Sequence, residues 1–499
     1  MLIPLPDYLD PRCSRESRDR YIKYIVPLWM VSSFATTSTF YGFNVWIIPI
    51  SLQMFGQDAI YSMETGQILY AFSMPTLISV LIMPFLSTEI EKIGVRLTTT
   101  IGIFLYVLGL VLGGVSVAND SLWGFWISIG IIGGFGYGLV YYPVAIYSVA
   151  WFREIDSPAL GSGLTGFFAG LWPAIFSFYC PLIIEWTSVS KSFYWNAFII
   201  SVCSIPTLLF QSSPTEVPLI EDTTLGSSNS NIIETSSSTE SGSGDEDTST
   251  TSSAAGMDVE GQSPSMIFTK LLPMTRLEIV STPQFYIQFL GHFLCMLPGF
   301  VMKFNISVFS SALFQTNIQT EAIIAFIFLF AYAIARLFVG LATGKLFSAD
   351  IAAQLASGIQ VPGFIGVAVI VITGSEYLLA YVVFEALIGI GLAAYKVTIT
   401  MNALSRWSMA NFPTVSALFF LAFGFAGIVG PVIGWMSLSI QGNIPLENGR
   451  TADILGVVQK ETTEKIVGIF FFVMAGVALA GFAINRYAVQ VVVKNKENL

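Results

Sequence analysis

Twelve long apolar stretches divide this chain, and they constrain its fold more than any other feature. A helix needs about 20 apolar residues to cross a bilayer core about 30 Å thick. None of the stretches shows the polar–apolar alternation of a membrane barrel strand, so helices are expected. The predicted spans are 24–50, 66–87, 97–118, 122–150, 158–184, 193–210, 284–312, 321–343, 352–373, 376–401, 413–437 and 466–486. The sequence therefore predicts an all-α membrane protein with twelve transmembrane helices.

The composition agrees with this prediction. Apolar residues make up 54% of the chain, charged residues only 11%, and the mean hydropathy is +0.72. A typical soluble protein has about 25% charged residues. One histidine and four cysteines leave little material for a metal site or a disulfide framework. No H-E-x-x-H cluster or phosphate-binding loop occurs, so we expect no enzyme, no ATP-driven pump, no cofactor and no nucleic-acid partner.

The basic residues indicate how the spans face. With the N-terminus inside the cell, the cytoplasmic segments carry 15 of the 22 Lys and Arg residues, and the external loops carry four. This asymmetry follows the positive-inside rule. The segment before the first span contains Arg12, Arg15, Arg18, Arg20 and Lys23, which indicates a cytoplasmic flank rather than a signal peptide. We expect both termini in the cytosol and, by default, the plasma membrane.

The spans form two halves of nearly equal length, 24–210 and 284–486. A long segment, 211–283, separates them, and short cytoplasmic segments, 1–23 and 487–499, lie at the ends. These ranges are the predicted domain organisation.

The segment between the halves has the composition of a disordered linker. Within residues 221–260, 18 of 40 residues are Ser or Thr, nine are acidic and none is basic. Such a stretch buries too little apolar surface to offset the entropy of ordering. The net charge of −10 comes mostly from this stretch. A solvated spacer is the expected role, and phosphorylation near Asp245 is the alternative.

A short polar turn follows the second span of each half. A glycine lets two helix ends approach closely, and an acid near a helix N-terminus meets the positive end of its dipole. Such a turn would stabilise one conformation of a two-state molecule. The two turns are residues 87–96 and 340–345.

Two six-helix halves, a cytoplasmic linker and this repeated turn resemble the major facilitator superfamily, whose motif reads G-x-x-x-D-R/K-x-G-x-R. The resemblance implies a gating role for the residues that match this motif, which are Glu91, Lys92, Gly94 and Arg96 in the first copy and Gly340 and Lys345 in the second. Ser87 replaces the first glycine of the first copy, and Gly344 replaces the acid of the second. The resemblance implies the major facilitator fold, in which spans one, four, seven and ten line a cavity. It also implies alternating access, in which the two halves rock around a midplane site.

A glycine-rich run in spans four and five is similar to the oxalate/formate antiporters and the monocarboxylate transporters. The run is Gly133–Pro143, then Trp151-Phe152, then Ala159-Leu160-Gly161 with Gly166 and Gly170; Asp156, Ser157 and Phe168 depart from the family pattern. Further similarity lies at Ser281–Tyr286 and Gly424–Pro431. Independently of family, small residues on one helix face favour close packing of transmembrane helices.

Few ionisable residues lie within the spans, and such residues are functional candidates because burying them is costly. Arg336 is the clearest, since guanidinium stays charged and grips a carboxylate with two hydrogen bonds. In the resembled families an arginine of span eight binds anions; a structural ion pair is the alternative. Tyr332 stands where the monocarboxylate transporters place an Asp, and span eleven lacks the lysine of the antiporters.

The other ionisable residues keep two interpretations each. We expect Lys396 to snorkel from a helix end, whereas Lys303 either snorkels or adds a second positive charge to the cavity. Glu385 either carries a coupling proton or neutralises Arg336 or Lys303. His292 is either a packed, hydrogen-bonded residue or a proton relay. In spans one and four, the candidate polar contacts, with aromatic packing as the alternative, are Tyr41, Asn44, Tyr137, Tyr141 and Tyr142.

Three bases against one acid in spans seven, eight and ten favour an anionic solute. The expected function is a secondary transporter for a small organic anion, a mono- or dicarboxylate, with protons as a candidate coupling ion. The alternatives are transport of an amino acid or other neutral or zwitterionic solute, with Glu385 meeting an amine, and a nutrient sensor that does not transport.

Overall fold

The computed structural model describes residues 5–56, 63–214, 274–314, 316–343, 345–374, 376–442 and 452–497. Within these ranges the chain is mostly helical and contains no strand, as the sequence predicted. The N-terminal half contains α1 (Arg15–Arg20), η1 (Tyr21–Ile25), α2 (Val26–Ser33), η2 (Phe34–Thr36), α3 (Thr37–Gly42), α4 (Asn44–Phe55), α5 (Met63–Ile93), α6 (Val95–Ala118), α7 (Leu122–Phe125), η4 (Trp126–Gly133), α8 (Gly134–Arg153), α9 (Pro158–Trp186), α10 (Val189–Cys203) and α11 (Ile205–Phe210). The C-terminal half contains α13 (Arg276–Ser281), α14 (Pro283–Phe314), α15 (Ile318–Ala342), α16 (Ala349–Ile372), α17 (Leu378–Gly442) and α18 (Ala452–Glu497).

Within the described residues, eleven helical segments are long and apolar enough to cross a membrane, and they match predicted spans two to twelve. Two of them, Leu378–Trp407 and Asn411–Gly434, belong to α17. The Lys396 ammonium nitrogen lies 3.8 Å from the centre of the Phe423 ring. An uninterrupted helix would separate these residues by about 40 Å. The chain therefore turns back between the two spans of α17.

The first predicted span, 24–50, is not a single helix. A 3-10 turn, η2, separates α2 from α3, and a second break at Phe43 separates α3 from α4. There the Trp46 amide donates to the Phe43 carbonyl at 2.8 Å, a bond across three residues rather than four. The first crossing is therefore discontinuous, and its one longer apolar helix is α4.

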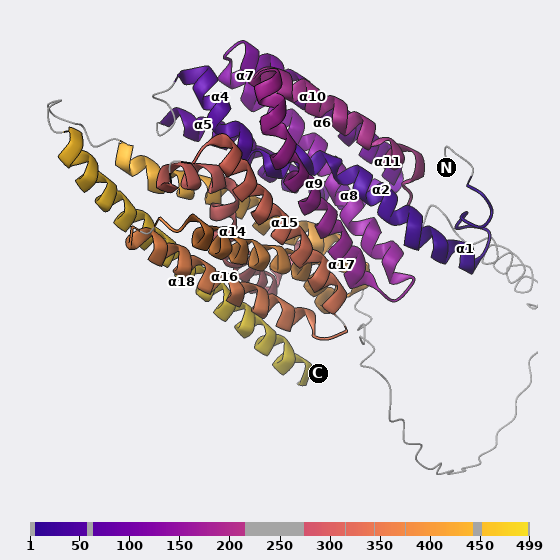
Figure 1. Cartoon of the computed structure of the whole chain (residues 1–499). Helices are drawn as coiled ribbons and strands as arrows, with labels where there is room; N and C mark the ends of the chain where they lie inside the picture. The colour runs from indigo at the N-terminus through magenta and orange to yellow at the C-terminus, as the bar shows by residue number, and fades with distance from the viewer. Residues whose placement is uncertain are drawn as a thin grey trace, which may run out of the picture.

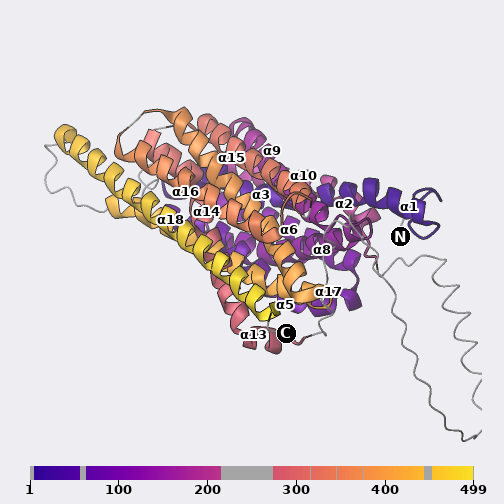
Figure 2. The same cartoon turned by 90° about the horizontal axis from the view of Figure 1, so that it is seen from below.

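The two halves lie side by side (Figures 1 and 2). They meet where α5 packs against α17, α9 against α15, and α4 against α14. The start of α1 and the end of α18 lie toward the same end of the bundle in both views. We call this end the linker end, because α11 finishes there and residues 211–283 follow α11.

Most of the predicted linker lies outside the described residues, but its first residues are packed. Gln211 is buried, and its carbonyl accepts hydrogen bonds from Arg96 at 3.0 and 3.2 Å. The Trp151 indole donates to the carbonyl of Ser212 at 2.8 Å. The linker therefore begins as part of the N-terminal half.

Glycines lie where α9 of one half crosses α15 of the other. A Cβ atom on Gly340 of α15 would lie 2.5 Å from the Cα atom of Gly163 on α9. A Cβ on Gly170 would lie 2.9 Å from Ala333. Small residues thus let α9 and α15 touch along their backbones, which confirms the packing interpretation of the glycine-rich run.

Candidate functional site

Three basic side chains from different helices of the C-terminal half meet at the interface between the halves. Lys303 comes from α14, Arg336 from α15 and Lys396 from α17. Lys303 is fully buried, and the other two are only 2% exposed. We call these three residues the cation cluster.

Tyr41 of α3 connects two of these cations to the N-terminal half. The Lys396 ammonium donates to the Tyr41 hydroxyl at 2.9 Å. The Lys303 ammonium lies 3.3 Å from the centre of the same ring. The face of an aromatic ring attracts a cation, most strongly where water is excluded. One tyrosine therefore binds one ammonium group through its oxygen and another through its ring.

Tyr332 of α15 contacts both Lys303 and the third basic residue, Arg336. The Lys303 ammonium lies 4.6 Å from the centre of the Tyr332 ring, and Arg336 donates to the Tyr332 hydroxyl at 3.4 Å. Arg336 also donates to the carbonyl of Gly166 on α9 at 3.2 Å. Arg336 therefore reaches across to the N-terminal half, as Lys396 and Lys303 do through Tyr41.

The cation cluster has no acidic counter-ion among the described residues, in which the five ion pairs all lie elsewhere. Within the part of the chain that the structure describes, the Lys303 ammonium nitrogen and the Arg336 Nε have no hydrogen-bond partner. Removing an ion from water costs several kcal/mol, and like charges repel more strongly at low dielectric. The arrangement therefore suits a ligand that brings negative charge.

The snorkelling predicted for Lys396 is wrong, and Lys303 does not snorkel either. The predicted span ends at residue 401, which puts Lys396 five residues from its end. The helical span continues to Trp407, so Lys396 lies 11 residues, or about 16 Å, from that end. Lys303 lies 11 residues before the end of α14, which leaves its ammonium equally deep.

Sequence reasoning missed three partners of the cluster. Tyr332 was noted only as the replacement of an acid, although its spacing of four residues from Arg336 puts both on one helix face. Phe423 packs against Lys396 from a span that carries no charge. Gly166 leaves room for Arg336, since a Cβ there would lie 2.2 Å from the Arg336 Nε. No sequence signal identifies this glycine as the neighbour of Arg336.

The other polar candidates of spans one and four surround the cluster. The Tyr137 hydroxyl donates to Tyr41 at 3.3 Å, and the Lys396 ammonium lies 4.8 Å from the centre of the Tyr141 ring. The Asn44 amide donates to the backbone carbonyl of Lys303 at 2.9 Å. Asn44 therefore supports the helix that carries Lys303.

Tyr142 lies nearer the linker end. Its hydroxyl donates to the carbonyl of Pro413 at 2.9 Å. Because α8 and α17 belong to different halves, this bond joins the halves away from the cation cluster.

Glu385 and His292 lie apart from the cation cluster. Glu385 is 1% exposed, accepts from the Tyr381 hydroxyl at 3.3 Å with one oxygen, and has no partner for the other. It precedes Lys396 by 11 residues of α17, or about 16 Å. Among the described residues it pairs with no base, so the predicted neutralisation of Arg336 or Lys303 is not seen.

His292 belongs to a second buried polar group. Its Nδ1 lies 2.7 Å from the Tyr395 hydroxyl, which also accepts from Asn485 at 2.7 Å. Its Nε2 has no hydrogen-bond partner. His292 is therefore packed and hydrogen-bonded, which is one of its two predicted roles. Its other predicted role, as a proton relay, stays a prediction.

The gating-motif residues are spread over two turns. Gly94 has a φ of +90° between α5 and α6, which explains why a glycine is required there. Lys92 pairs with the exposed Glu89 at 3.1 Å, while the side chain of Glu91 lies outside the described residues. Lys345 is exposed in the turn after α15. Gly340 has the clearest structural role, at the crossing with α9.

The chain is similar to a known family in sequence and to a known structure in fold. The family model described as Major Facilitator Superfamily matches residues 30–431. The crystal structure of the human organic anion transporter MFSD10 (TETRAN) is similar, with a TM-score of 0.57 and 12% identity. The match covers 94% of this chain and 99% of that chain. At this identity the likeness concerns the fold alone. A search of curated proteins finds no match.

Proposed function

Because the chain belongs to the major facilitator superfamily, a family of membrane transporters, we propose that it is a secondary transporter for a small organic anion. The cation cluster is the observation that carries this proposal. Three buried basic side chains at the interface of the halves lack an acidic partner among the described residues. A mono- or dicarboxylate would supply the missing negative charge and could contact both halves at once, as alternating access requires.

An amino acid fits this arrangement less well. The carboxylate of an amino acid could meet the cation cluster, but its amine would then need an acid close by. Glu385 is the acid that the sequence offered, and it lies about 16 Å along α17 from Lys396. The two charges of an α-amino acid are separated by only two bonds, so they cannot span that distance.

Two similarities agree with an anionic solute, although neither identifies the solute. The glycine-rich run resembles the oxalate/formate antiporters and monocarboxylate transporters, and the structurally similar human protein is named an organic anion transporter. For the coupling ion, we propose the proton, carried by Glu385 with His292 as a further candidate. We also propose the plasma membrane, with both termini in the cytosol.

The proposal is tested by reconstituting the full chain in liposomes and measuring uptake of labelled formate, lactate and oxalate. We expect Arg336→Gln and Lys303→Met each to lower carboxylate uptake at least tenfold. Lys191→Gln is the matched control, because Lys191 is exposed at the start of α10, and its uptake should be unchanged. Labelled amino acids serve as the alternative solutes.

Thermal unfolding of the same variants separates a binding role from a structural role. Lys303→Met removes a buried amine that lies beside two other basic groups and has no hydrogen-bond partner among the described residues, and its apolar chain can still pack on the Tyr41 ring. The melting temperature should therefore stay unchanged or rise. Loss of uptake together with a large loss of stability would point to a structural charge. Carboxylate uptake that survives both variants would overturn the proposal.

A further inference from the structure

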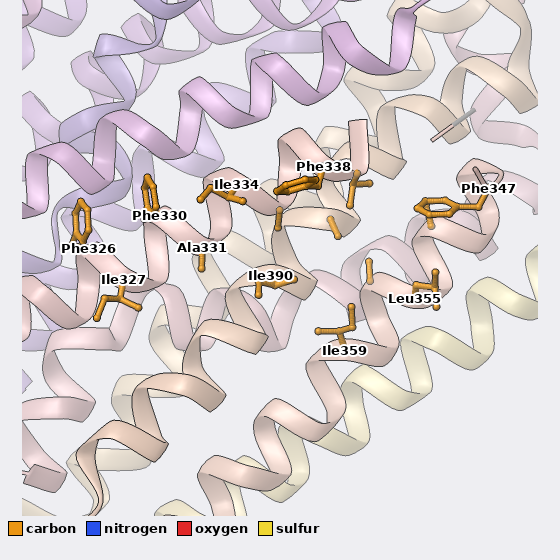
Figure 3. A pocket seen from close by; sticks show the side chains of 15 residues that line it. Phe326, Ile327, Phe330, Ala331, Ile334, Phe338, Phe347, Leu355, Ile359 and Ile390 are labelled. Carbon is orange, nitrogen blue, oxygen red and sulfur yellow. The ribbon is translucent and has the colours of Figure 1, made fainter. Parts of the chain in front are cut away.

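A cavity of about 600 Å³ is lined by residues of α15, α16 and α17 and of the turn after α15 (Figure 3). Every side chain that lines it is a Phe, Ile, Leu, Val or Ala. Part of the lining is exposed at the surface: Phe338 is 65% and Leu355 52% exposed. The cavity is therefore an apolar groove, open along one side, and it does not include the cation cluster.

The packing of the helices explains why the groove exists. α15 packs against α9 and α17, whereas α16 packs against α17 and α18. The facing sides of α15 and α16 are therefore held apart by their other partners. Several of the residues that line the space are alanines, whose side chains are too small to fill it. They are Ala331, Ala335, Ala352, Ala356 and Ala394.

The surroundings of the groove determine what kind of molecule can occupy it. α15 and α16 are both membrane-spanning segments, so the open side of the groove faces hydrocarbon. Water is disfavoured inside, because no polar side chain lines the groove and a buried water needs two to four polar partners. An apolar chain from the bilayer is the remaining class of occupant.

The length of the groove matches one leaflet. Along α15 it runs from Phe326 to Phe338, twelve residues or about 18 Å. One leaflet of hydrocarbon is about 15 Å deep, half of a core about 30 Å thick. On α16 the lining residues, which fall within 352–359, all lie in the half of the helix that begins at Ala349, toward the linker end, so the occupant enters from the leaflet on that side.

A basic side chain lies where a lipid headgroup would be. The groove ends at Phe347, two residues after the exposed Lys345. The nearby Arg406 of α17 is already paired with Asp350 at the start of α16. Lys345 forms no ion pair among the described residues, so it is available to a phosphate.

From these observations we propose that the groove binds one acyl chain of an anionic phospholipid, whose headgroup meets Lys345. The lipid would lie behind two helices of the cation cluster, because Ala335 is next to Arg336 in sequence and Ala394 is two residues before Lys396. This site is separate from the solute site, and the inference does not depend on the solute being an anion.

Photolabelling tests the proposal. The full-length protein is reconstituted in phosphatidylcholine vesicles that contain a trace of phosphatidylglycerol with a diazirine at its acyl end, and the labelled peptides are mapped. We expect labelling of residues 326–359 to exceed that of the exposed apolar face of α6 around Phe104 severalfold. Unlabelled phosphatidylglycerol should compete, and added phosphatidylcholine should not.

Two variants make the test specific. Ile359→Trp should fill the groove from α16 and reduce the labelling, whereas Ile365→Trp on an exposed face of the same helix should not. Lys345→Gln should weaken the preference for phosphatidylglycerol about fivefold, since one basic residue near the surface contributes about that factor. Equal labelling of all exposed faces, or labelling and lipid preference that these variants do not change, would overturn the proposal. Solute uptake is not a readout, so a failure here is distinct from failure of the proposed function.

Discussion

The Lys396 ammonium nitrogen lies 2.9 Å from the Tyr41 hydroxyl oxygen, although the two residues belong to different halves of the molecule. The Lys303 ammonium lies 3.3 Å from the centre of the same ring. Tyr41 is therefore the point at which the N-terminal half contacts two of the three cluster cations. Any movement that separates the halves must exchange these contacts for others.

Replacing Tyr41 by phenylalanine removes the hydrogen-bond acceptor of Lys396 and keeps the ring that faces Lys303. A hydrogen bond to a charged group contributes about 1.5–3 kcal/mol, so Tyr41→Phe should lower the melting temperature and reduce solute uptake. Tyr194→Phe, at a partly exposed tyrosine of α10, is the control and should change neither. Wild-type stability and uptake for Tyr41→Phe would mean that the hydroxyl contact is unimportant.

Gly166 leaves the space that the Arg336 guanidinium occupies. An alanine Cβ there would lie 2.2 Å from Nε, so Gly166→Ala must displace the guanidinium, and we expect uptake to fall at least tenfold. The matched control is Gly476→Ala, where nothing lies within 4 Å of the new atom. That control should be neutral or stabilising by up to about 1 kcal/mol, because alanine favours a helix. Equal uptake by the two variants would contradict the role of Gly166.

At the crossing of Gly163 and Gly340, an added side chain should lower the stability of the protein. A Cβ on Gly340 would meet backbone atoms, which cannot move aside as a flexible side chain can. Gly340→Ala should therefore push α9 and α15 apart and destabilise the protein by about 1–3 kcal/mol, as overpacking does. Gly358→Ala in α16 meets no atom within 4 Å and should leave the melting temperature unchanged or higher. A Gly340→Ala melting temperature equal to that of Gly358→Ala would show that the helices can adjust.

Replacing Glu385 should affect the coupling of transport to protons and not the folding of the protein. It forms no ion pair among the described residues, so Glu385→Gln, which has nearly the same shape, should fold normally. If Glu385 carries the coupling proton, this variant should lose the stimulation of uptake by an inward proton gradient. Glu376→Gln, at an exposed acid of the same half, should keep it. Full stimulation in Glu385→Gln would exclude this carboxyl as the proton carrier.

Local composition was sufficient to place the spans and to select the candidates. A run of about 20 apolar residues crosses a bilayer whatever its neighbours are, so eleven of the twelve spans could be located from the sequence. Arg336 and Lys303 could be selected because a charge within such a run is rare and costly. The first span was the exception, because its breaks at η2 and Phe43 arise from local backbone bonds that an apolar run does not reveal.

Only the tertiary structure decided how these residues are used. The bond of Lys396 to Tyr41 and the fit of Arg336 against Gly166 depend on contacts between segments more than 100 residues apart. The apolar groove likewise depends on the partners that hold α15 and α16 apart. Membrane insertion depends on each segment by itself, whereas burial, pairing and cavities depend on several segments together. For this reason the sequence determined which charges enter the membrane, and the packing of the two halves determined which of them meet.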